Sequence, residues 1–171
     1  MFGWWRKRRG PPPIPEALWQ QVLARYPFLA RRPPQELARL REMSASFLQV
    51  KEFHGAQGLV ITDEMALSIA AQAVLPVLHL GLHWYDDFGG IVVHPDEVIA
   101  RRTMVDEAGV VHDWDEVVAG EAMERGPVML SWHDVQEAGE RVADGYNVVI
   151  HEFAHKLDQR DGRSDGCPPL P

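Results

Sequence analysis

The sequence has one cysteine, Cys167, and lacks an apolar run long enough to span a membrane. A single cysteine excludes an internal disulfide framework, so nothing in the chain requires an oxidising compartment and we expect a cytoplasmic location. The longest apolar run, residues 69–84, is interrupted by polar side chains and by Pro76, and we interpret it as a buried helix. Prolines follow the basic cluster near the N-terminus, where a signal peptide would be apolar. We therefore expect no export signal and no stable membrane insertion.

Basic residues are scarce in most of the chain. The net charge is −8; residues 1–62 hold ten Lys and Arg against four acids, and residues 63–171 hold seven against twenty-one. The positive charge is concentrated in the N-terminal segment and along one amphipathic stretch, not interleaved with aromatics over a folded face. We expect no nucleic-acid binding.

The length of 171 residues and the hydrophobic fraction of 46% suit one domain. We assign residues 1–14 to a basic, proline-rich tail and residues 15–171 to the domain.

Helices are expected in the first part of the chain. Pro15 favours a helix over 16–26, and the proline pair at 33–34 favours a second one that ends near residue 50. Thr62, followed by two acids, favours a helix start before the apolar segment 65–78.

Short apolar runs broken by Gly, Pro and Asp follow from residue 89 onward, and they predict strands within 89–95, 98–105, 109–114 and 126–132. Residues 107–109 resemble a hairpin connection. Ser131 with Asp134 resembles a capping box that opens a helix over 133–145, followed by the helix that carries the sequence HEFAH. The order of helices, strands and helices predicts an α+β fold with helices packed on a small mixed or antiparallel sheet.

The motif HEFAH at residues 151–155 contains the candidate metal-binding and catalytic residues. On a helix, His151 and His155 are one turn apart and present their rings to the same side, where they can hold one metal ion. Neutral imidazoles suit Zn²⁺, which polarises a carbonyl and lowers the pKa of a water, and Glu152 is placed to accept the proton of that water. This combination favours hydrolysis of a peptide bond. The alternative is a pair of histidines at the edge of the core, hydrogen-bonded to carbonyls or acids.

Other histidines and the cysteine are weaker candidates. The sequence HLGLH at residues 79–83 has the same spacing but lacks an acid, and Gly81 weakens a helix there. His94 is expected at a strand end, and His133 lacks evident metal-binding partners nearby in sequence. Cys167 is interpreted as a bystander thiol.

Four segments together resemble the Mlc titration factor A family of bacterial zinc metallopeptidases, and the resemblance covers nearly the whole chain. They are NVVIHEFAHKLD with the DG that follows it, DGCPPL, LVITDEMALSIAAQAVLPVL and WYDDFGGIVVHPDEV. The resemblance implies a zincin-like core, aminopeptidase-like activity on peptides, a cytoplasmic location and, for the founding member, binding to a transcriptional repressor of sugar uptake. It also implies that His151 and His155 are zinc ligands and that Glu152 is the general base.

The family supplies its third zinc ligand from a glutamate on a helix well downstream of HEFAH, and this chain reaches Pro171 before such a helix. The chain therefore resembles the first two-thirds of a family member, and we expect the C-terminal part of the domain to be missing from it. Asp161 lies where metzincins place their third ligand, although the glycine of that pattern is absent. Asp158 is too far from His151 along a helix to share its metal, and we interpret it as a surface or supporting group.

Two hypotheses of function remain. The first is a zinc peptidase whose substrate lies along an edge strand beside the HEFAH helix. The second is a catalytically incompetent binding protein with a zincin-like fold that sequesters a transcriptional repressor.

Overall fold

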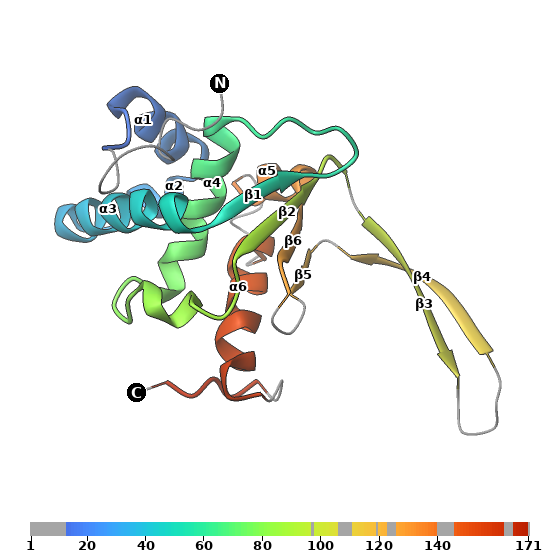
Figure 1. Cartoon of the computed structure of the whole chain (residues 1–171). Coiled ribbons are helices and arrows are strands. Elements are labelled where there is room, and N and C mark those ends of the chain that lie inside the picture. The colour runs from blue at the N-terminus through green and yellow to red at the C-terminus, as the bar shows by residue number, and fades with distance from the viewer. Residues whose placement is uncertain are drawn as a thin grey trace.

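A computed structural model describes residues 13–96, 98–105, 111–118, 120–122, 126–139, 146–162 and 166–170 (Figure 1). Its α-helices are α1 (Glu16–Arg25), α2 (Pro27–Ala30), α3 (Pro34–Val50), α4 (Asp63–Val74), α5 (Trp132–Glu137) and α6 (Val148–Asp158). Its strands are β1 (Glu52–Gly55), β2 (Gly90–His94), β3 (Val98–Val105), β4 (Val111–Val118), β5 (Gly120–Ala122) and β6 (Val128–Ser131). The structure also has short 3-10 helices. η1 (Leu75–Val77) follows α4, η2 (Leu82–Tyr85) precedes β2, and η4 (Gln159–Asp161) follows α6.

The main sheet has the strand order β1-β2-β6-β5. Strands β1, β2 and β6 are parallel, and β5 joins the edge antiparallel to β6. Of the two predicted alternatives, a mixed or an antiparallel sheet, the antiparallel one is therefore wrong, and the sheet is mixed, with three parallel strands and one antiparallel edge strand. Strand β1 lies between α3 and α4, so the predicted order of helices followed by strands is also wrong, and the fold is mixed α/β. Parallel strands need long crossover connections, and α4 with the two turns after it supplies the one between β1 and β2.

Strands β3 and β4 pair antiparallel in a separate two-stranded sheet, which extends away from the body of the molecule in Figure 1. The ladder agrees with the predicted hairpin, while its connection at 106–110 lies outside the described residues.

The helix starts follow local chemistry. Pro15 precedes α1 and Pro34 is the first residue of α3. Proline is tolerated at a helix start because its missing N–H would have no partner within the helix there. Thr62 and Ser131 cap α4 and α5 by accepting hydrogen bonds from the backbone N–H groups of Met65 and Asp134. Helix α5 ends at Glu137, earlier than predicted, and residues 140–145 of the predicted helix lie outside the described part.

The core lies between the helices and one face of the sheet. Ile91 and Val93 of β2 and Val128 and Leu130 of β6 are almost fully buried on that face. Helix α4 is buried along its whole length from Met65 to Val74, as predicted for this segment. No helix in the described ranges combines the length and the apolarity needed to cross a bilayer.

Candidate metal centre on helix α6

Helix α6 is anchored at its N-terminus by Asn147. The Asn147 side-chain oxygen accepts a hydrogen bond of 2.9 Å from the Ile150 N–H, and its Nδ2 donates one of 2.7 Å to Oε1 of Gln72 in α4. Gln72 is fully buried. One side chain therefore both caps α6 and ties it to the central helix.

An aromatic cluster holds the inner face of α6. The Phe153 ring is fully buried, and its centroid lies 5.2 Å from that of Tyr85 and 5.8 Å from those of Phe47 and Phe88. These are the separations of tilted and edge-to-face aromatic pairs. Because residues two positions away from Phe153 point to the opposite side of a helix, this packing directs His151 and His155 outward.

The two histidines lie side by side on the outer face of α6. Their Nε2 atoms are 3.0 Å apart, their ring centroids are 4.5 Å apart, and both side chains are exposed. Two nitrogens bound to one tetrahedral zinc at about 2.0–2.1 Å are about 3.3 Å apart. The histidine pair is thus close to the spacing that one zinc ion requires.

The surroundings of His151 favour the neutral form of its imidazole ring. Although the side chain is exposed as a whole, partial desolvation of the ring by burial lowers its pKa, and the neighbouring His155 ring lowers it further. The Tyr146 ring contributes to this covering, with its centroid 5.8 Å from that of His151. A neutral imidazole is the form that binds a metal, so the environment favours the state that the proposed chemistry needs.

Glu152 occupies a buried position, with 4% of its surface exposed. Burial raises the pKa of the Tyr146 phenol, and the carboxylates of Glu152 and Asp134 raise it further. Glu152 therefore acts electrostatically on the same tyrosine whose ring contacts His151. Tyr146 belongs to no motif that predicts this role, and the only signal in the sequence is its position five residues before His151.

The third ligand expected for a catalytic zinc is not found among the described residues. No histidine, cysteine, aspartate or glutamate there joins His151 and His155 in a group of three closely spaced ligand atoms. Asp161 lies exposed in η4 and is not brought together with the two histidines in such a group. Asp158 is 93% buried and its Oδ2 accepts a hydrogen bond from the Gly166 N–H, so of its two interpretations, a surface or a supporting group, the surface one is wrong.

A different group of potential ligands lies on α5. His133, Asp134 and Glu137 each offer one ligand atom, and these atoms lie within 4.8 Å of one another. His133 Nδ1 is 3.6 Å from Asp134 Oδ1, and His133 Nε2 is 3.6 Å from Glu137 Oε1. The expectation that His133 lacks such partners is therefore wrong, because positions four apart on a helix meet.

The second histidine pair does not share one helix. Gly81 has a φ of 99°, a backbone conformation that glycine adopts readily, and it separates His79 from His83 by breaking the helix between them. His79 instead lies 3.4 Å from the carboxylate of Glu36. His94 ends β2 as expected, and Cys167 is exposed.

Strand β5 lies beside α6. It pairs with β6 on one side and is the end strand of the four-stranded order, and α6 packs against both strands. An edge strand offers backbone N–H and C=O groups on its outer side, which an extended peptide can pair with.

The glucose-regulated metallo-peptidase M90 family model matches residues 2–171. The chain is 38% identical over 172 residues to Mlc titration factor A of Klebsiella pneumoniae (strain 342), covering 100% of this chain and 64% of that protein. It is 37% identical over 171 residues to Mlc titration factor A of Yersinia pestis (strain Pestoides F), covering 99% of this chain and 62% of that protein. The chain thus spans a little under two thirds of the length of these relatives. It belongs to the glucose-regulated metallo-peptidase M90 family, in agreement with the resemblance of its sequence to the Mlc titration factor A family.

Proposed function

We propose that the protein is a zinc-dependent peptidase of aminopeptidase-like activity with a zincin-like core. His151 and His155 are the proposed zinc ligands and Glu152 is the proposed general base. The observation that carries the proposal is the pair of outward-facing Nε2 atoms 3.0 Å apart on α6. The family match supports a metallopeptidase.

The proposed mechanism assigns a task to each residue. The lowered pKa of His151 keeps its ring neutral at neutral pH, so that its nitrogen is available as a ligand. When bound, zinc supplies a Lewis acid that polarises the scissile carbonyl and acidifies a nearby water. Glu152 accepts a proton from the attacking water and later donates it to the leaving amine. The outer edge of β5 holds the peptide substrate in an extended conformation beside α6.

A third ligand is part of the proposal. Two imidazoles alone hold zinc weakly and orient it poorly. The resemblance to the family implies a glutamate, and the described residues do not provide a third ligand atom beside His151 and His155. We place that ligand outside the described residues.

A regulatory role is the second candidate function. The relatives bear the name Mlc titration factor A, and the resemblance stated from the sequence implies repressor binding for the founding member of that family. The observation that favours this candidate is the two-ligand site, because a protein that sequesters a repressor needs no complete metal centre. We propose a cytoplasmic location for either role, since a repressor partner is found there.

Zinc binding tests the proposal directly. Equilibrium dialysis of the 171-residue chain is expected to show about one bound zinc, with affinity at least roughly tenfold weaker in the double variant His151→Ala/His155→Ala. The matched control is His79→Ala/His83→Ala, which removes two histidines of the same sequence spacing and is expected to bind like the wild type. Equal binding by the two double variants would contradict the proposed metal centre. Repressor binding that survives in His151→Ala/His155→Ala would support the regulatory role.

A further inference from the structure

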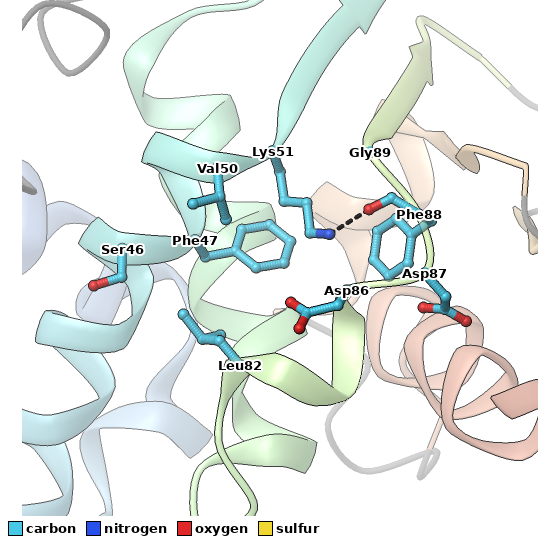
Figure 2. Close-up of a pocket in the computed structure, with 9 residues that line it drawn as sticks. All are labelled: Ser46, Phe47, Val50, Lys51, Leu82, Asp86, Asp87, Phe88 and Gly89. Carbon is cyan, nitrogen blue, oxygen red and sulfur yellow. Dashed lines mark hydrogen bonds between the residues drawn. The ribbon is translucent and has the colours of Figure 1, made fainter.

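A pocket of about 470 Å³ is lined in part by Phe47 and Phe88, which also belong to the aromatic cluster around Phe153. It is formed by the C-terminal end of α3 and by the segment from Leu82 to Gly89, as Figure 2 shows. None of the residues proposed to bind zinc lines it.

One wall of the pocket carries a buried positive charge. Lys51 is 92% buried, its Nζ donates hydrogen bonds to the backbone carbonyls of Tyr85 and Phe88, and Nζ lies 4.0 Å from the centroid of the Phe88 ring. Burial lowers the pKa of Lys51, while the carboxylates of Asp86 and Asp87 oppose that effect. A lysine ammonium has three N–H donors, and the two carbonyls use two of them.

The opposite wall carries a negative charge. The Asp86 side chain enters the pocket from the end of η2, whereas the Asp87 side chain points away from it (Figure 2). Among the described residues, Lys51 and Asp86 form no ion pair within 4.0 Å, and no other side chain there hydrogen-bonds to the Asp86 carboxylate. The two opposite charges therefore face the same space without neutralising each other by direct contact.

Apolar side chains occupy the space between these charges. Phe47 and Phe88 are almost fully buried beneath the pocket, Leu82 is half-buried, and Val50 is 63% exposed at its rim. A ligand with an apolar part would remove this surface from water.

We propose that this pocket binds a free α-amino acid with an apolar side chain. The amino-acid carboxylate accepts a hydrogen bond from Lys51 Nζ, its ammonium group pairs with Asp86, and its side chain packs on Phe47, Leu82 and Val50. A simple anion would be repelled by Asp86 and a simple cation by Lys51, whereas a zwitterion satisfies both charges.

The pocket is connected to α6 by packing. Phe47 and Phe88 form its floor, and both contact the Phe153 ring on the inner face of α6. A bound amino acid therefore stabilises the layer that supports the HEFAH helix, and it raises the melting temperature by mass action.

Isothermal titration calorimetry with L-leucine tests the proposal on the chain kept metal-free with a chelator. Leucine is expected to bind, while N-acetyl-L-leucine, which lacks the ammonium group, and L-leucinamide, which lacks the carboxylate, bind at least roughly tenfold more weakly. Because these comparisons change only the ligand, they hold even where a variant folds poorly.

The variants locate the binding. Asp86→Asn is expected to weaken leucine binding at least roughly tenfold, and the matched control Asp87→Asn to leave it within about twofold. Leucine affinity is expected to be the same in His151→Ala/His155→Ala, which separates this pocket from the proposed metal centre. Absence of leucine binding at about 10 mM, binding of either analogue as tight as that of leucine, or loss of leucine binding in the histidine variant overturns the proposal.

Discussion

The side-chain amide of Asn147 donates a hydrogen bond to the buried Oε1 of Gln72, and so the first residue before α6 is fastened to α4. Gln72 uses its own amide to donate to the Ser68 carbonyl within α4. The position of the histidine-bearing helix is thus fixed by a polar link inside an otherwise apolar core.

Replacing Asn147 is expected to destabilise the protein in two separable ways. Asn147→Ala loses the cap, which costs about 0.5–2 kcal/mol, and it leaves the Gln72 oxygen without a partner, which costs about 1–3 kcal/mol more. Asn147→Ser keeps a capping oxygen and loses only the link to Gln72, so its free energy of unfolding should fall between those of wild type and Asn147→Ala. Urea denaturation measures all three. Identical values for the two variants would mean that the cap contributes nothing.

Truncating Phe153 is expected to remove the support of α6. Its fully buried ring contacts three other aromatic rings, so Phe153→Ala should lower the free energy of unfolding by about 3–5 kcal/mol. Phe153→Leu keeps most of the volume and should cost less than about 1.5 kcal/mol. Chemical denaturation of both variants checks the difference, and a loss below about 1 kcal/mol for Phe153→Ala would show that the cluster does not carry the helix.

Local signals predicted the helix starts but not the sheet. Prolines favour the starts of α1 and α3, and hydroxyl side chains cap α4 and α5. These effects involve residues close together in the sequence, so the sequence alone predicts them. Strand β1 has only Phe53 buried among four residues, so it shows no alternation, and its parallel pairing with β2 joins segments almost forty residues apart. Such pairings depend on tertiary packing.

In the candidate site, too, the sequence predicts the local features and not those that depend on tertiary packing. The spacing of His151 and His155 predicts their meeting, because it follows from helix geometry alone. Lys51 and Asp86, by contrast, line the same pocket although they are 35 residues apart in the sequence, and no sequence motif predicts that the fold brings them together. The grouping of His133 with Glu137 could have been predicted from the sequence, because the two residues are four positions apart within a predicted helix.

The stability of the metal-free protein should depend on pH through His151. Its pKa in the folded chain is lowered from the ordinary value of 6.5, mainly by burial. Between these two pKa values the unfolded chain binds a proton that the folded chain does not, so the free energy of unfolding rises with pH across this window.

The variant His151→Gln lacks this proton uptake. As the pH rises toward the ordinary histidine pKa of about 6.5, the unfolding free energy of wild type should therefore increase relative to that of His151→Gln, and the difference should stay constant above that pH. Urea denaturation in chelator-containing buffers over this range measures it. Two curves that run parallel through the whole range would show that the folded environment does not shift His151.

Changing Glu152 to glutamine separates proton transfer from metal binding. Glutamine has nearly the same shape as glutamate but cannot accept a proton, so Glu152→Gln is expected to lower kcat for peptide hydrolysis by about 10²–10⁴-fold. Because Glu152 is buried within α6 while the two histidine rings face outward, zinc affinity in equilibrium dialysis should stay near the wild-type value. The measurement pairs a fluorogenic aminopeptidase substrate with the dialysis assay on the same preparations. If Glu152→Gln hydrolyses the substrate at the wild-type rate with unchanged zinc content, Glu152 is not the general base. If the variant loses both zinc and activity, Glu152 is needed for the structure of the metal centre.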